Sequence, residues 1–294
     1  MGLRNHIGKM ASTATTLMLA TALTALGAVG AKAGCLDDIK SRGVITAGMG
    51  IMGMKPYVWK DGDQVKGFEW EMFQELAKRL GVPKAEYAVT EWSSLIPGLK
   101  SQKWDIVMSS MSVTQERIQG AGITFSRPYL IQYDVLVVNS GSQIKTLADL
   151  KGKTIGATLG SMESINSHRL VDSGAAARVA DFNGMAEPFL ALANKQVDAV
   201  MADQLTYAVQ KQGLSGLTAV GDPIPYQPKP GWEAQEAKAD YIQGSAAVAL
   251  RPDCTDLKAA IDSALLQMET DGTRQRIFKT YGIWDATQQN LVKS

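Results

Sequence analysis

The sequence has few of the residues on which metal and nucleophile chemistry depends. Its 294 residues include two cysteines and two histidines, and one of the histidines, His168, lies beyond residue 33. Two cysteines cannot supply the four ligands of a structural zinc site. The patterns H-E-x-x-H, C-x-x-C and G-x-S-x-G do not occur, which removes the zinc-protease, dithiol and serine-hydrolase signatures. We therefore expect neither a metal nor a cofactor.

An excess of either charge is also lacking. The chain holds 30 Lys and Arg against 29 Asp and Glu. Loss of Arg4, Lys9 and Lys32 with an N-terminal signal would leave 27 against 29. Such a balance argues against nucleic acid or an anionic membrane as the main partner.

Long apolar runs are confined to the N-terminus. Two basic residues precede the apolar stretch Thr15–Gly30, and residues 31–33 read Ala-Lys-Ala. A basic start, a short apolar core and an A-x-A site predict a cleaved secretory signal peptide over residues 1–33 and a periplasmic protein. A membrane anchor would need a longer and more apolar stretch. Lipoprotein processing at Cys35 is the other alternative, although Lys32 stands where a lipobox has an aliphatic residue.

A glycine pattern raises the question of a nucleotide cofactor. Residues 48–53 read G-M-G-I-M-G directly after the apolar run 44–46, which is the spacing of the dinucleotide-binding fingerprint. That fingerprint requires a helix to open inside the glycines and to direct its N-terminus at the pyrophosphate. Here Pro56 follows three residues later, and the first helical pattern begins at Phe68. We interpret the segment as a methionine-lined loop.

Strand-like and helical patterns alternate along the rest of the chain. Apolar residues recur at helical spacing from Phe68 to Leu80, and Gly81 with Pro83 ends that helix. Further strands are predicted at 105–110, 133–139, 151–160, 197–203 and 244–252, helices after residue 160, at 184–196 and over 256–281, and a loop at 222–239. This alternation predicts an α/β fold with mostly parallel sheets.

Several segments also match the motifs of a known family, in the same order along the chain. They are KGFEWEMFQELAKRLG, WSSLIPGLKSQKWDIVMSSMSVTQER, FSRPY, IKTLADLKGKTIG, ALANKQVDAVMAD and METDGTRQRIFKTYG. Together they resemble the periplasmic solute-binding proteins of polar amino acid ABC importers, the extracellular solute-binding proteins of family three. The resemblance covers essentially the whole chain after residue 33. It implies a type II periplasmic-binding-protein fold, in which two α/β lobes joined by two hinge strands close on a ligand.

The resemblance also implies how the chain is divided. Lobe 1 is expected from residues 34–134 and 244–294, and lobe 2 from residues 135–243, with hinge strands near 133–139 and 244–250. Cys35 and Cys254 then both belong to lobe 1. Because exported proteins form disulfides, we predict that these two cysteines are bonded to each other.

A cluster of hydroxyl groups beside one arginine is the first candidate site. Ser110 and Ser112 stand at and after the end of a predicted strand, and Arg117 follows. Ligands of α/β proteins lie outside the carboxyl ends of strands, and a guanidinium fork suits both oxygens of a carboxylate. The spacing alone equally fits an arginine on a solvated helix. The resemblance implies that Arg117 holds the α-carboxylate of the ligand, with Ser110 and Ser112 as hydroxyl partners.

The predicted second lobe supplies a helix start and an acid. Free N–H groups at a helix N-terminus attract anions, and the resemblance implies that the backbone at Ser161 and Met162 closes on the same carboxylate. Asp203 ends a predicted strand and is implied to bind the ligand ammonium group. Ordinary helix capping by Ser161 and Asp203 is the competing interpretation, and capping and binding are compatible.

The side-chain pocket is expected to be lined by soft and aromatic residues. Trp92 matches the aromatic position before L-I-P, and Met54 falls near a second aromatic position of the family. Met packs adaptably and Trp offers a face to apolar or cationic groups. Glu163 is the expected additional polar group. The glycine loop contains no acid, which disfavours a simple basic amino acid as the ligand.

The resemblance implies a binding component of an ABC importer. It would capture an amino acid or amino-acid-like zwitterion as a monomer and deliver it to a permease in the inner membrane. Two alternatives remain open. Cyclohexadienyl dehydratases use this fold for catalysis with a carboxylic acid in the cleft, which would give Glu163 a catalytic role. A sensor would instead present its closed form to a chemoreceptor or a membrane kinase.

Overall fold

The computed structural model describes residues 34–228, 231–239, 241–242, 244–289 and 291. The predicted signal peptide, residues 1–33, lies outside the described residues. None of the described helices is long and apolar enough to cross a membrane.

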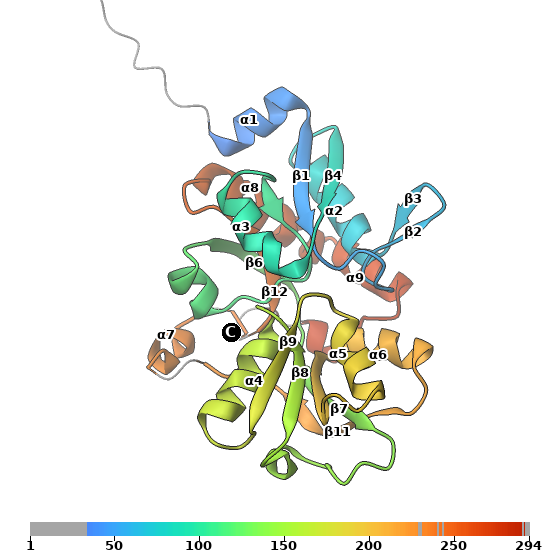
Figure 1. The fold of residues 1–294 in the computed structure, drawn as a ribbon. Helices are drawn as coiled ribbons and strands as arrows, with labels where there is room; N and C mark the ends of the chain where they lie inside the picture. Colours follow the sequence, from blue (N-terminus) through green and yellow to red (C-terminus); the bar gives the residue numbers. More distant parts are fainter. Residues whose placement is uncertain (1–33, 229–230, 240, 243, 290, 292–294) are drawn as a thin grey trace, which may run out of the picture. The chain divides into compact units, whose positions relative to one another are not determined.

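The first sheet joins strands from both ends of the sequence (Figure 1). Its order is β4-β1-β5-β12-β6. The strands are β1 (Val44–Met49), β4 (Lys84–Val89), β5 (Ile106–Val107), β6 (Thr124–Leu130) and β12 (Ala246–Leu250). The ladders of β1 with β4 and β5 are parallel, whereas β12 is antiparallel to both of its neighbours. Four strands therefore run in one direction and β12 is reversed.

The second sheet has the same plan. Its order is β11-β7-β10-β8-β9. The strands are β7 (Asp134–Asn139), β8 (Thr154–Thr158), β9 (Arg178–Phe182), β10 (Ala199–Asp203) and β11 (Leu217–Ile224). Only β7 runs against the others among these five. A separate hairpin consists of β2 (Trp59–Asp61) and β3 (Gln64–Lys66). The prediction of an α/β fold with mostly parallel sheets is confirmed.

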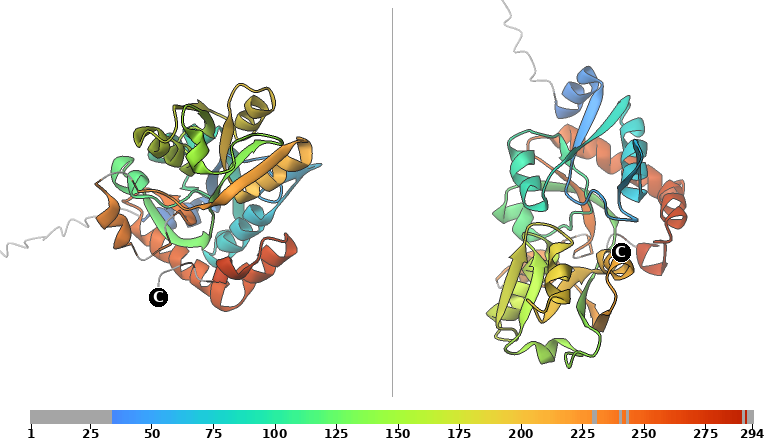
Figure 2. Two further views of the ribbon diagram at one scale, coloured as in Figure 1. Left: turned by 90° about the horizontal axis from the view of Figure 1, so that it is seen from below. Right: turned by 45° about the vertical axis from the view of Figure 1, so that its right-hand side comes forward.

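Helices cover these sheets. The helices on the first sheet are α1 (Cys35–Arg42), α2 (Phe68–Arg79), α3 (Leu95–Lys100) and α8 (Thr255–Thr270), and α9 (Thr273–Thr280) packs on α2 and α8. Those on the second sheet are α4 (Met162–Asp172), α5 (Glu187–Ala193) and α6 (Gln204–Gly213). Shorter elements are α7 (Glu233–Ala237), η1 (Trp92–Ser94), η2 (Glu116–Gly120), η3 (Leu147–Leu150) and η4 (Ala286–Gln289). Figure 2 shows the C-terminal helices in red beside the blue and cyan N-terminal part, consistent with the contacts of α8 and α9 with α2.

The chain crosses twice between the sheets. Residues 131–133 lead from β6 to β7, and residues 225–245 lead from β11 to β12. The two reversed strands, β7 and β12, therefore each follow a crossing directly. These are the positions at which hinge strands were predicted from the sequence.

Side-chain alternation explains how the second sheet is buried. Leu136 and Val138 pack in one apolar cluster, whereas Val137 packs with Phe189 in another. Successive side chains of a strand point to opposite faces, so both faces of β7 are covered. The strand is correspondingly apolar from residue 135 to residue 138 and shows no polar alternation there.

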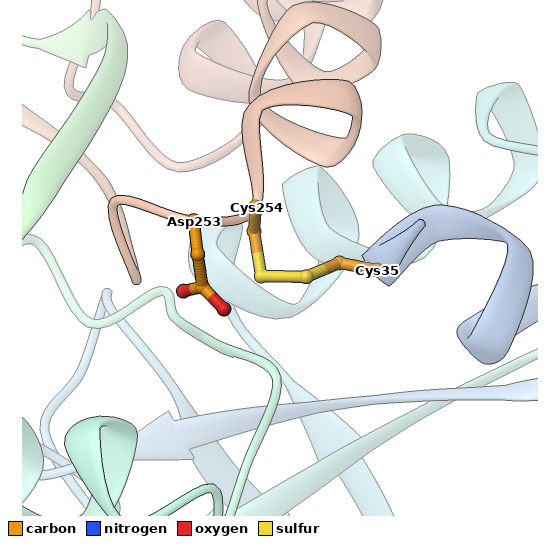
Figure 3. Close-up of side chains that lie close together, drawn as sticks. All are labelled: Cys35, Asp253 and Cys254. Carbon is orange, nitrogen blue, oxygen red and sulfur yellow. A yellow bond between two sulfur atoms is a disulfide. The ribbon is translucent and has the colours of Figure 1, made fainter. Parts of the chain in front are cut away.

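The predicted disulfide is confirmed (Figure 3). Cys35 at the start of α1 is bonded to Cys254, the residue before α8, and their Cα atoms are 5.3 Å apart. Asp253 lies beside the two sulfur atoms, and its carboxylate is 3.6 Å from the Arg251 guanidinium. Because both sulfurs are committed to the disulfide, these three residues form no thiolate metal site.

Two local predictions differ from the structure. The strand expected over 105–110 is reduced to β5, which ends at Val107, and Ser110 with a φ of 52° is not extended. The segment 222–239, predicted as a loop, contains the end of β11 and the short helix α7.

Candidate functional site

A narrow cavity lies where both sheets present the carboxyl ends of their strands. Its lining residues are Ile51, Tyr57, Trp92, Ser109, Ser110, Ser112, Gln132, Met162, Glu163, Met185 and Asp203. The volume is about 20 Å³, which is room for about one water molecule. A larger molecule can enter only if the walls separate.

The serines after β5 are positioned by buried hydrogen bonds. The Ser109 hydroxyl accepts the N–H of Gly50 at 3.1 Å. The Ser110 hydroxyl donates to the buried carboxyl group of Glu69, so it is directed away from the cavity. The Ser112 carbonyl oxygen accepts a bond from Arg117. The predicted role of Ser110 as a hydroxyl partner of the ligand therefore requires its side chain to exchange partners.

Arg117 lies between the two sheets but outside the cavity lining. Its side chain is 4% exposed. One terminal nitrogen donates to the carbonyl of Ser112, and the other donates to the carbonyl of Gly160 at 2.8 Å. Burial lowers the pKa of Arg117 to about 10, so the group remains a cation at neutral pH. It links the loop after β5 to the loop after β8.

Asp203 has two structural roles. The sequence suggested the first, helix capping, and did not suggest the second, a bond to Tyr57. Its Oδ1 accepts the N–H groups of Leu205 at 2.9 Å and Thr206 at 2.8 Å, which confirms the capping of α6. The same oxygen accepts the hydroxyl of Tyr57 at 2.6 Å. The Tyr57 hydroxyl in turn accepts the side-chain amide of Gln132 at 3.0 Å. Burial, followed by the charge of Asp203, raises the pKa of Tyr57 well above its ordinary value.

Sequence reasoning missed Tyr57 and Gln132. Tyr57 belongs to the loop that contains the glycine pattern, and Gln132 lies in the first crossing segment. The available signals were the aromatic residue after Pro56 and the position of Gln132 just before the predicted hinge strand. Neither signal specifies the direction of a side chain.

The N-terminus of α4 forms part of the opposite wall. Ser161 caps this helix by accepting the N–H of Ser164 at 3.2 Å, and its own N–H donates to Thr158 at 3.1 Å. Met162 lines the cavity. A Cβ atom at Gly244, which has a φ of 79°, would lie 2.8 Å from the Met162 sulfur, so glycine allows this side chain to pack there.

Among the described residues, acidic groups outnumber cations around the cavity. Glu163 is 8% exposed, and burial followed by the charge of Asp203 raises its pKa to about 7. Asp134 is fully buried, and burial followed by the charge of Glu163 raises its pKa well above the ordinary value. Asn166 donates to Asp134 at 2.8 Å. Arg117 is the nearby cation that lowers the pKa of Glu163, and a cationic group bound in the cavity would lower that pKa further.

An ion pair also joins the two sides. Arg169 of α4 contacts the carboxylate of Glu116 in η2. The side chains of Arg169 and Glu116 are 15% and 22% exposed. The pair, the Arg117 bond to Gly160 and the Tyr57 bond to Asp203 together hold the walls close to each other.

The structure brings most of the predicted site residues together. Trp92, Ser110, Ser112, Met162, Glu163 and Asp203 all line the cavity. Arg117, Ser161 and Met54 lie outside the lining. The Met54 sulfur accepts from the Gln210 side chain at 3.7 Å, while Ile51 and Met185 occupy the apolar part of the wall.

Comparisons with known proteins agree with this fold. Residues 49–283 match the bacterial extracellular solute-binding proteins, family 3. The chain is 33% identical over 153 residues to a probable histidine-binding protein of Campylobacter jejuni, a match that spans 52% of this chain and 57% of that protein. It is 29% identical over 260 residues to the L-cystine-binding protein TcyJ of Escherichia coli, covering 87% and 88% of the two chains. An ancestral amino acid-binding protein, described as a precursor of cyclohexadienyl dehydratase, aligns with a TM-score of 0.66 and 26% identity over 85% of this chain and 99% of that one.

Proposed function

Because this chain belongs to the bacterial extracellular solute-binding proteins of family 3, we propose that it captures an amino acid or a similar zwitterion between its two sheets. The observation that carries the proposal is the composition of the cavity wall. Carboxyl groups of Glu163 and Asp203 line the cavity, and the Arg117 guanidinium lies beside Ser112 at its edge. A zwitterion needs acceptors for its ammonium group and paired donors for its carboxylate. The names of the relatives, which refer to histidine, L-cystine and amino acids, support this class.

The proposed roles follow the charges. Asp203, with Glu163 beside it, binds the ammonium group. Arg117 binds the carboxylate after exchanging its bonds to the carbonyls of Ser112 and Gly160, and Ser112 and the start of α4 add donors. Trp92 contacts the side chain of the ligand. The excess of carboxyl groups over cations supports a ligand with at least one ammonium group.

The proposed mechanism is closure about a hinge. Lobe 1 comprises residues 34–134 and 244–294, lobe 2 comprises residues 135–243, and the crossings before β7 and β12 act as the hinge. The small volume of the cavity supports this mechanism because an amino acid can enter only when the lobes separate. A ligand bonded by both lobes shifts the equilibrium by its preference for the closed form.

We further propose a periplasmic location and delivery to an ABC permease. The N-terminal signal pattern and the extracellular character of the family support the location. The closed form, with its lobes locked by the ligand, is the form that a permease would distinguish from the open one.

A thermal-shift panel of amino acids, opines, betaines and ectoine-like solutes tests the proposal, with calorimetry on the best compound. An α-amino acid or a close analogue should raise the melting temperature, and its ester, which lacks the carboxylate, should not. A panel in which no zwitterion binds would contradict the proposed function.

A second candidate function is cyclohexadienyl dehydratase activity. It is favoured by the buried carboxyl group of Glu163, whose pKa of about 7 suits proton transfer, and by the similarity to a precursor of such an enzyme. Incubation with prephenate and arogenate decides between the two functions. A binding protein returns both compounds unchanged, whereas turnover that Glu163→Gln abolishes would establish the enzyme.

A further inference from the structure

Ser110 has an unusual backbone conformation for a residue in a cavity wall. Its φ of 52° places it in the left-handed region, which side chains rarely adopt. The other described non-glycine residues with positive φ, Gln102 and Lys195, are exposed on the surface. Ser110 is 5% exposed and lines the cavity. A strained conformation at such a site persists only where neighbouring groups hold it.

Two buried side chains hold Ser110 in place. Its backbone N–H donates to the hydroxyl oxygen of Tyr129 at 3.0 Å. Its own hydroxyl donates to Oε1 of Glu69. The Tyr129 hydroxyl donates to the same Oε1 atom at 2.8 Å. Both bonds that fix Ser110 therefore end at one oxygen of Glu69, a residue of α2 with no exposed surface.

We propose that Glu69 is a positioning residue of the binding site, which holds Ser110 in the left-handed conformation that shapes the first-sheet wall of the cavity. This inference rests on the proposed function. Glu69 contributes through Ser110 and does not itself line the cavity. Its second oxygen, Oε2, is buried without a hydrogen-bond partner among the described residues. Because a buried and incompletely bonded carboxyl group destabilises a fold, a role in packing alone would be better served by an apolar side chain.

The charge of Glu69 determines how firmly Ser110 is held. The titratable groups that face Glu69 are Tyr129 from β6 and Tyr87 from β4, and no cation of the described chain pairs with it. Burial raises the pKa of Glu69 to about 7. A carboxylate accepts stronger hydrogen bonds than a neutral carboxyl group. Protonation therefore loosens the hold on Ser110, and the affinity for the ligand falls as the pH falls through about 7.

The test must separate Glu69 from Glu163, whose pKa lies in the same range. All variants are therefore made in the Glu163→Gln background. Glu69→Gln keeps the acceptor oxygen and removes the charge. Glu71→Gln is the matched control, because Glu71 lies in the same helix and accepts only from the Tyr281 hydroxyl, at 2.5 Å, in the described structure.

The first measurement is a pH series of calorimetric titrations from pH 5.5 to 8.5 with the panel amino acid that gives the largest thermal shift. At pH 8.5, Glu69→Gln should lower the affinity about tenfold, which is the difference between a charged and a neutral acceptor, and it should flatten the pH dependence. Glu71→Gln should change neither. Equal affinity and equal pH dependence with and without Glu69→Gln would overturn the proposal.

The second measurement needs no ligand, so it distinguishes failure of this inference from failure of the proposed function. The NMR chemical shift of the Ser110 backbone amide nitrogen should change with pH around pH 7 while Glu69 is present. In Glu69→Gln it should stay constant over the same pH range. If the Ser110 amide shift still changed near pH 7 in Glu69→Gln, the titrating group would be a residue other than Glu69. That result would refute the positioning role.

A double-mutant cycle with Ser110→Gly completes the test. Glycine adopts positive φ without strain and has no hydroxyl group. Glu69→Gln should therefore reduce the affinity far less in the Ser110→Gly background than in the presence of Ser110. Equal losses in both backgrounds would show that Glu69 acts on the site by a route other than Ser110.

Discussion

The Tyr57 hydroxyl donates a 2.6 Å hydrogen bond to Oδ1 of Asp203, and the two residues come from opposite walls of the cavity. Tyr57 lies in the loop after β1, whereas Asp203 ends β10 of the second sheet. The same oxygen caps α6. The contact therefore connects the wall of the first sheet to a fixed point of the second sheet, at the residue that we propose binds the ligand ammonium group.

Tyr57→Phe should weaken ligand binding by about 1.5–3 kcal/mol, the range for a hydrogen bond to a charged group. The substitution keeps the ring and removes only the bond that crosses the cavity. Calorimetry with the best panel compound measures the change. Tyr207→Phe is the control, because the Tyr207 hydroxyl accepts the N–H of Ala219 at 3.1 Å away from the cavity. Equal affinities for wild type and Tyr57→Phe would remove the contact from the binding mechanism.

Arg117→Ala should weaken binding by roughly 2–5 kcal/mol, as truncation of one half of a buried charge pair does. Arg117→Lys should restore little, because an ammonium group cannot reproduce the bidentate fork. Asp203→Asn should cause a smaller loss than Arg117→Ala. The exposed Arg276 provides the control Arg276→Ala. Near wild-type affinity of a folded Arg117→Ala protein would mean that the carboxylate site is misplaced.

Trp92→Ala should change the order of preference among ligands as well as the affinity. Trp92 is proposed to contact the ligand side chain, and an indole face attracts a cationic group by about 0.5–2 kcal/mol. The full panel is measured again on the variant. Trp59→Ala removes an indole outside the cavity lining and should leave the order unchanged. If Trp92→Ala weakens all ligands equally, the residue does not select among side chains.

Glu163 should make the stability of the unliganded protein depend on pH. Its pKa is raised from 4.5 to about 7 by burial and by Asp203. A carboxyl group with a raised pKa in the folded state stabilises the fold fully below pH 4.5, and this stabilisation is lost as the pH rises through about 7. In the wild type the free energy of unfolding should therefore fall as the pH rises from 4.5 to above 7. Glu163→Gln should make this fall smaller, by at most about 3 kcal/mol.

Urea unfolding of wild type and Glu163→Gln across pH 4.5–8 measures that difference. Glu187→Gln, at an exposed position, is the control and should follow the wild type. Parallel stability profiles for wild type and Glu163→Gln would show that Glu163 titrates alike in the folded and unfolded chain.

The disulfide should stabilise the protein strongly. It joins residues separated by 219 positions, for which the chain-entropy relation gives up to about 5 kcal/mol. Replacement of Cys35 and Cys254 by serine should lower the free energy of unfolding by up to this amount. Thiol titration of the denatured, unreduced wild type should detect no free cysteine, and detection of two would contradict the bond.

Periodicity allowed some elements to be predicted and left others unassigned. Helix α2 could be placed because its apolar spacing and Gly81 mark both its face and its end. The conformation of Ser110 could not be predicted, since it depends on hydrogen bonds to Glu69 and Tyr129, which are 41 and 19 positions away. Such contacts leave no periodic signal in the sequence.

The site residues that follow the carboxyl ends of strands could be predicted from the sequence. Asp203 and Ser112 follow β10 and β5, and carboxyl ends of strands meet at one edge of a sheet. The loop after β1 has no periodic pattern, so its register could not be fixed. Met54 was therefore expected in the pocket, where Ile51 and Tyr57 lie.

The strand order has a consequence for biosynthesis. All described strands of the second sheet come from the continuous segment 134–224, whereas β12, the last of the described strands, lies between β5 and β6 of the first sheet. As the polypeptide emerges with its N-terminal end first, the second sheet can therefore form while the first sheet still lacks a central strand. Until residue 250 has emerged, β5 and β6 have no partner between them. The emerging chain thus passes through an interval in which β5 and β6 lack the strand that joins them in the folded protein.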